Sequence, residues 1–148
     1  MEIKQELTEE LRSGEVTLIA ERNGVYYRSY GPGVKPIVTP MKNSRDFFKG
    51  ASVADKVIGK AAALLLILSG AEYVYGETMS EAAVSVLEAD SVAYAFGQKV
   101  KYIKNREGND MCPLEKCVSE TENPAEAWIL IGNKIAELMK QKEGKVSE

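Results

Sequence analysis

Both cysteines of the chain lie in one short stretch, NREGNDMCPLEKC, at residues 105–117. A cysteine becomes a nucleophile or a metal ligand when its thiolate form is stabilised. Cys112 precedes Pro113, and because Pro is common at the first position of a helix, Cys112 is predicted to cap a helix where the helix dipole favours a thiolate. Cys117 would lie about 140° further around that helix, so one ion could not be held by both thiols. Cys112 is therefore the candidate nucleophile, with an inert half-buried thiol as the alternative, and Cys117 is expected to be a core residue.

A second stretch, ADKVIGK at residues 54–60, could hold an anion. Lys56 and Lys60 are four residues apart, which would place both on one face of a helix, with Asp55 in its first turn. Gly59 disfavours a helix, and its usual reason is the close approach of a ligand or a backbone. The two lysines would suit an anionic ligand. The alternative is a capping Asp followed by lysines whose stems lie along apolar surface.

A third stretch, GETMSEAA at residues 76–83, reads as a strand that runs into a helix. Such a junction can present free backbone N–H groups to an anion near Ser80, although an ordinary helix cap is the alternative. With the turn before Cys112, these stretches give one predicted set of ligand-binding residues. Its members are Asp55, Lys56, Gly59, Lys60, Ser80, Asn105, Arg106 and Glu115.

Composition excludes several classes of protein. The chain has no histidine, so it cannot form a Ser-His or Cys-His nucleophile pair, and two thiols with carboxylates make a poor zinc set. No metal or other cofactor is therefore predicted, unless a subunit interface doubles the thiols. The net charge is -3 and the basic residues are scattered, which argues against a nucleic acid as partner.

Composition also predicts where the protein works. The apolar run at 61–68 is too short to cross a membrane. The first residues are charged and unlike a signal peptide, and two cysteines read as free thiols. We expect a cytoplasmic protein that binds a small molecule and could form a homo-oligomer.

Elements that could position these residues follow from local patterns. Asn23-Gly24 between two β-rich runs predicts a hairpin. Ser52 as N-cap, with Asp55 three residues on, predicts a buried helix over 52–69. Trp128, Ile131, Ile135 and Leu138 form one stripe of the last helix. In order, the sequence predicts a helix at 2–12, a hairpin within 16–30, a shaped loop at 31–40, helices at 41–48 and 52–69, a strand at 71–77, a helix at 78–90, strands at 91–96 and 99–103, a helical turn from 112, a helix from 123 and a frayed tail at 140–148.

A buried central helix between strands needs cover on both sides. The order of elements therefore indicates an α/β fold, a three-layer α/β/α sandwich on a mixed sheet. The chain length and the lack of a linker predict a single domain over residues 1–148.

Three segments together resemble an uncharacterised bacterial family, a domain of unknown function with a cytidine deaminase-like fold. They are GPGVKPI, VADKVIGKAAALL and NREGNDMCPLE, and the likeness spans roughly residues 14–118. Zinc deaminases carry His (or Cys)-Ala-Glu on the buried helix and Pro-Cys-x-x-Cys at the start of the next. Neither motif is present, since the second helix would open as Thr78-Met79-Ser80-Glu81-Ala82. The resemblance implies the fold and the position of a pocket, but not deamination.

We therefore expect a deaminase-fold protein without catalytic zinc that binds a small anionic ligand, such as a nucleotide or a phosphometabolite. A Cys112-dependent enzyme with transferase or thiol chemistry is one alternative. A regulatory or interaction subunit without any reaction is another.

Overall fold

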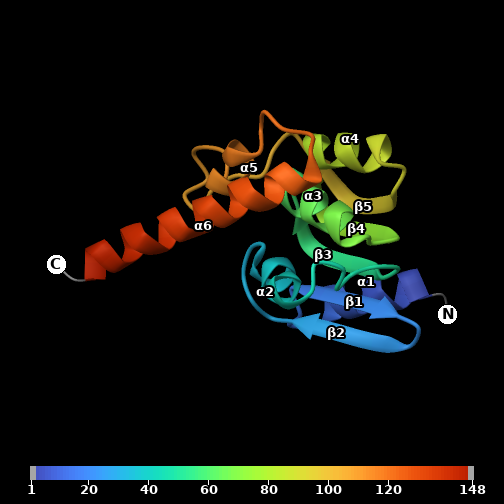
Figure 1. The fold of residues 1–148 in the computed structure, drawn as a ribbon. Helices are drawn as coiled ribbons and strands as arrows, with labels where there is room; N and C mark the ends of the chain where they lie inside the picture. Colours follow the sequence, from blue (N-terminus) through green and yellow to red (C-terminus); the bar gives the residue numbers. More distant parts are fainter. Residues whose placement is uncertain (1–2, 147–148) are drawn as a thin grey trace.

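The protein is described by a computed structural model over residues 3–146, with side chains through residue 142 (Figure 1). Five strands form one mixed sheet in the order β2-β1-β3-β4-β5. β1 pairs antiparallel with β2 on one side and with β3 on the other, whereas β3, β4 and β5 run parallel to one another. The strands are β1 (Leu18–Arg22), β2 (Val25–Ser29), β3 (Ser52–Ile58), β4 (Tyr73–Ser80) and β5 (Ala93–Val100).

Helices cover both faces of this sheet unequally. α1 (Ile3–Ser13) lies alone on one face, where its Leu7 and Leu11 are buried against β1, β3 and β4. The other five helices lie on the opposite side, with α6 packed outside α3. They are α2 (Lys35–Asn43), α3 (Lys60–Ser69), α4 (Glu81–Ala89), α5 (Pro113–Cys117) and α6 (Pro124–Val146). The α/β/α sandwich expected from the sequence is confirmed.

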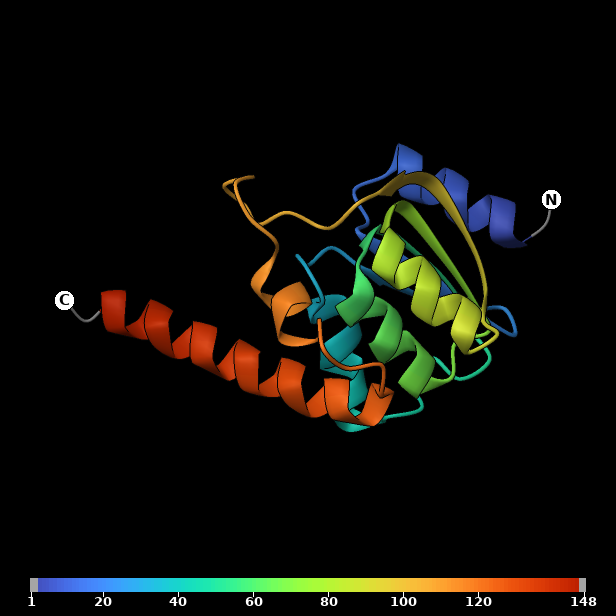
Figure 2. The ribbon, with the colours of Figure 1, turned by 90° about the horizontal axis from the view of Figure 1, so that it is seen from above.

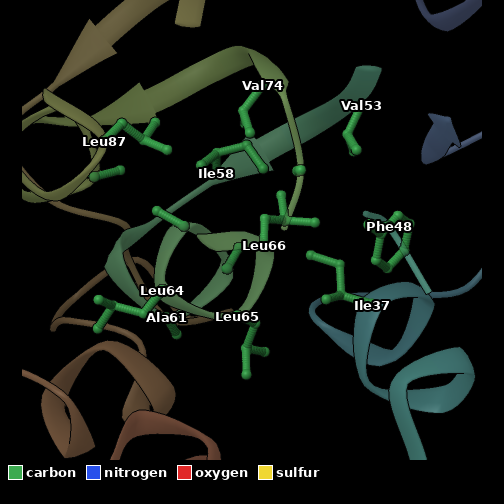
Figure 3. Packing of buried hydrophobic residues seen from close by; sticks show 14 of the residues in the cluster. Ile37, Phe48, Val53, Ile58, Ala61, Leu64, Leu65, Leu66, Val74 and Leu87 are labelled. Atoms are coloured by element: carbon green, nitrogen blue, oxygen red, sulfur yellow. The ribbon is translucent and has the colours of Figure 1, made fainter. Parts of the chain in front are cut away.

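The core lies around α3, whose sequence KAAALLLILS is apolar nearly all round. Leu64, Leu65 and Leu66 are fully buried, and Figure 3 shows them between the sheet, α2 and the C-terminal helices. Gly70 ends the helix with φ 90°, in the left-handed region that glycine adopts without strain. A helix enclosed in this way holds its first residue, Lys60, in a fixed place at the carboxyl ends of the parallel strands.

The hairpin prediction is confirmed, because Asn23 and Gly24 both have positive φ and Arg22 pairs with Val25. The helix predicted over 52–69 is wrong in its first half. Residues 52–58 form β3, which pairs with β1 and β4, and the helix begins only at Lys60. The β-branched residues of SVADKVI fit a buried strand, and this preference outweighs the apparent cap at Ser52.

Other boundaries also differ from the prediction. The helix expected at 41–48 lies instead at Lys35–Asn43, with Pro36 in its first turn, so the predicted loop at 31–40 is partly helical. The two strands expected at 91–96 and 99–103 are one strand, β5, that runs through Gly97. The last helix continues to Val146, so fraying from residue 140 is wrong for that range, and residues 147–148 lie outside the described part. Within that part, no helix has the length and apolar character needed to cross a membrane.

Candidate functional site

The start of α3, where an anionic ligand was expected, is occupied by the chain's own Glu115. The Lys60 N–H donates to Oε1 of Glu115 at 2.7 Å, and the Ala61 N–H donates to Oε2 at 2.9 Å. A carboxylate at a helix N-terminus satisfies N–H groups that have no partner within the helix. Burial raises the pKa of Glu115 above its usual range, while the two N–H donors act in the opposite direction. Glu115 therefore caps α3 in the place where a ligand phosphate would otherwise bind.

Gly59 is the N-cap residue of α3, and it leaves the room that Glu115 needs. A Cβ at this position would lie 2.4 Å from the carboxyl carbon and from Oε1 of Glu115. The backbone of Gly59 has φ −98°, which any residue adopts, so no conformational reason requires glycine here. The close approach that the sequence suggested at Gly59 is thus the approach of Glu115.

Lys60 also has a partner within the chain. Its buried Nζ donates to the Ser119 carbonyl at 3.2 Å and to Oε1 of Glu122 at 3.1 Å. The expected pairing with Lys56 on one helix face is wrong, because Lys56 lies exposed on β3 while Lys60 lies on α3. The anionic partner predicted for Lys60 is supplied by the loop that precedes α6.

Asp55 is buried on β3, between Leu18 of β1 and Gly76 of β4, rather than in a first helical turn. Its Oδ1 accepts the Val57 N–H at 3.3 Å, whereas Oδ2 has no hydrogen-bond partner in the described part of the chain. Burial raises the pKa of Asp55 to about 7. The residue is therefore a buried acid that gains or loses its proton near neutral pH.

The side chains of Ser80 and Asn105 accept hydrogen bonds from backbone N–H groups of the chain itself. Ser80 Oγ accepts the Ala83 N–H at 3.1 Å, which is the ordinary helix cap left open as the alternative. Oδ1 of Asn105 accepts the N–H groups of Gly108 and Asn109, at 2.8 and 3.2 Å. These bonds close the turn between Lys104 and Met111, which form an isolated β-bridge.

The cysteine segment adopts the predicted local structure. Cys112 is the N-cap residue of α5, and Pro113 is the first residue of that helix. Cys117 is half-buried against the core, and its Sγ donates to the Leu114 carbonyl at 3.1 Å. Burial raises the pKa of the Cys117 thiol. Arg106 lies exposed at the preceding turn, which projects from the body of the molecule (Figure 2).

A cavity of about 550 Å³ lies beside this segment, at the carboxyl ends of the three parallel strands. Val57 of β3, Thr78 of β4 and Val100 of β5 form its floor. The segment that follows β5 forms the rest of the wall. The wall residues are Lys101, Tyr102, Ile103 and Lys104.

This cavity pairs an apolar floor with two cations. Lys101 and Lys104 are exposed, and neither forms an ion pair with a carboxylate of the described residues. Val57 is 45% exposed and Tyr102 is 37% exposed, so both present apolar surface to solvent. The Cys112 N–H donates to the Ile103 carbonyl at 2.9 Å, which ties the wall to the start of α5.

None of the predicted ligand-binding residues lines the cavity, although Lys56 and Asn105 are chain neighbours of residues that do. The sequence signal for it is the alternation of basic with apolar residues in KVKYIK, residues 99–104, which reads equally well as a solvated strand. Across the described residues, no group of three or more Cys, Asp or Glu side chains is placed to hold a metal ion.

The family model TM1506, described as a domain of unknown function (DUF1893), matches residues 6–135 of this chain. Among solved structures, the chain is similar to a DUF1893 family protein (TM1506) from Thermotoga maritima, with a TM-score of 0.81 and 25% sequence identity. That likeness covers 90% of this chain and 92% of the other. No curated protein matches the chain. Because the family model spans most of its length, the chain belongs to the DUF1893 family.

Proposed function

We propose that this protein binds a small anionic ligand with an apolar ring, such as a nucleotide, in the cavity at the carboxyl ends of β3, β4 and β5. One observation carries the proposal. The cavity combines an apolar floor with two lysines that have no carboxylate partner among the described residues.

The size and place of the cavity support this proposal. Its volume of about 550 Å³ is typical of pockets for small molecules. In α/β sheets, ligands bind outside the carboxyl ends of parallel strands, because that edge gathers the loops that follow several strands. Here Val57 and Tyr102 would contact the ring of the ligand, while Lys101 and Lys104 would pair with its phosphate.

The position of Glu115 argues for this cavity over the start of α3. Its carboxylate already accepts the two N–H groups that a phosphate would need there. An external anion would first have to displace a buried side chain. We therefore infer that the anion site lies at Lys101 and Lys104 and not at Lys60.

Binding without a reaction is the form of the proposal that we favour. Cys112 does not line the cavity, and the chain has no histidine that could serve as its base. A cytidine deaminase-like fold without deamination remains part of this proposal. It is supported by the opening hairpin, the helix-linked parallel strands and the lack of the deaminase zinc motifs.

Isothermal titration with adenosine and cytidine nucleotides tests the proposal, with the matching nucleosides as uncharged comparisons. The variant Lys101→Met/Lys104→Met should lose roughly 10- to 100-fold in affinity for a nucleotide, since each charge-assisted contact contributes about 1.5–3 kcal/mol before losses to solvent. The control is Lys99→Met, which removes one lysine charge from β5 at a residue that does not line the cavity. Equal affinities for the double variant and for the unsubstituted protein, or no nucleotide binding at all, would overturn the proposal.

A further inference from the structure

The helix α6 carries two apolar stripes, and only one of them faces the core. Ile131 is buried, and Trp128 and Ile135 pack partly buried against the core. A second stripe is exposed and follows the spacing i, i+3, i+7, i+10, which is the seam of a coiled coil. We call it the α6 seam; its residues are Ile129, Gly132, Ala136 and Met139.

Nothing within the described chain covers the α6 seam. Ile129 is 60% exposed and Met139 is 59% exposed, which is high for large apolar side chains. The C-terminal half of α6 extends beyond the body of the molecule, and no other element lies beside it in either view (Figures 1 and 2). An apolar seam on an extended helix is typical of a protein interface.

A cavity of about 290 Å³ opens at one end of this seam, between α2 and α6. Its lining is mostly apolar, with two polar residues, Lys42 and Asn133. The apolar residues are Val38 of α2 and Trp128, Ile129, Ile131 and Gly132 of α6. Met139 lies at the other end of the seam, about 15 Å from Ile129 along the helix axis. The seam thus carries both an apolar cavity and an exposed side chain of the kind that would fill one.

We propose that the α6 seam binds the same seam of a second copy of this chain, with the two helices antiparallel. A two-fold axis near residue 134 then places Met139 of each copy at Ile129 and the cavity of the other. It also places Gly132 opposite Ala136 of the partner subunit. These small side chains let the two helix backbones approach closely, and the contact is self-complementary, as a two-fold interface requires.

The charges beside the seam favour this antiparallel direction. Glu126 lies one turn before the seam and Lys140 directly after Met139, both at the position next to the seam on the same side. Antiparallel packing pairs Glu126 with Lys140 of the partner subunit, twice by symmetry. Parallel packing would instead set Met139 against Met139 of the partner subunit and leave both cavities unfilled.

Light scattering and sedimentation of the full chain test this inference. The unsubstituted protein should form a dimer, and Met139→Lys should weaken that dimer by more than about tenfold. Tyr30→Lys is the control, because Tyr30 is 63% exposed and directly follows the edge strand β2, outside the α6 seam. It should leave the dimer unchanged.

The charge pair tests the direction of the helices separately. Glu126→Lys should weaken the dimer, because it places two like charges beside each other at each end of the seam, and Glu126→Lys/Lys140→Glu should restore the dimer. The residues substituted in these two tests are all exposed, so circular dichroism should show an unchanged fold. They are Tyr30, Glu126, Met139 and Lys140. A monomeric unsubstituted protein, or a dimer that survives Met139→Lys, would overturn the inference. If Glu126→Lys/Lys140→Glu dimerises as weakly as Glu126→Lys, the antiparallel direction of the helices is wrong.

Discussion

Removing the Glu115 carboxylate should destabilise the protein through the start of α3. Glu115→Ala leaves the N–H groups of Lys60 and Ala61 without the partners that they now have at 2.7 and 2.9 Å. Each buried unsatisfied N–H costs about 1–3 kcal/mol. Part of this loss is offset, because the variant no longer buries a carboxylate. We expect the free energy of unfolding to fall by roughly 2–4 kcal/mol.

Gly59→Ala should produce a similar effect by a different route. The new Cβ would lie 2.4 Å from the Glu115 carboxyl group, so the carboxylate must move away from its two donors. Because the φ of Gly59 is ordinary, the cost is steric and should be about 1–3 kcal/mol. Once Glu115 is already Ala, the same methyl group meets no carboxylate. Gly59→Ala should then cost under about 1 kcal/mol, which gives a coupling energy of roughly 1–3 kcal/mol.

Urea denaturation of the four proteins of this double-mutant cycle measures the coupling. Gly31→Ala is the matched control, since a Cβ there would meet its nearest neighbour at an ordinary 3.8 Å. Its effect should be the same with and without Glu115. Additive losses for Gly59→Ala and Glu115→Ala would refute the view that Gly59 exists to admit this carboxylate.

Three further predictions concern the buried acid, the buried lysine and the cysteines. The pKa of Asp55 is about 7 in the folded protein, against an ordinary value of 3.8 for an unfolded chain. The contribution of Asp55 to the free energy of unfolding is therefore fully present below pH 3.8 and is lost as the pH rises through 7. Between pH 5 and pH 8 the free energy of unfolding should therefore fall by roughly 2–3 kcal/mol more than in Asp55→Asn, and parallel pH profiles from urea denaturation would contradict this. Lys60→Met should fold and lose only about 1–2 kcal/mol in free energy of unfolding, because Glu122 is exposed enough to be hydrated once the lysine is gone. Its nucleotide affinity in titration should be unchanged, and a large loss of affinity would instead place the ligand at the start of α3. Cys112 should be alkylated faster than Cys117, whose thiol pKa is raised by burial, and mass mapping that shows equal or reversed rates would disprove it.

Local signals in the sequence were sufficient for much of the fold. Asn23-Gly24 fixes the hairpin, because two consecutive residues with positive φ leave few other turns. The Cys112-Pro113 helix start likewise depends only on neighbouring residues. The register of β3 could not be read in the same way. A run of buried residues has no periodicity that separates strand from helix, so only the pairing with β1 and β4 decides it.

The candidate site shows the same limit. Gly59 and Lys60 indicated that a negative charge lies at this point, and the structure places Glu115 and Glu122 there, more than fifty residues further along the chain. A contact over that distance has no local signature. The cavity at Lys101 and Lys104 depends on three strand ends and a returning loop, which only the completed sheet brings together.

Amide chemical shifts recorded during titration with a nucleotide report residue by residue where the ligand binds. We expect shifts at Val57, Thr78 and residues 100–104, where the cavity lies, and little change at residues 59–61, where Glu115 caps the helix. Shifts confined to the start of α3 and to Cys112, with none at residues 100–104, would contradict it.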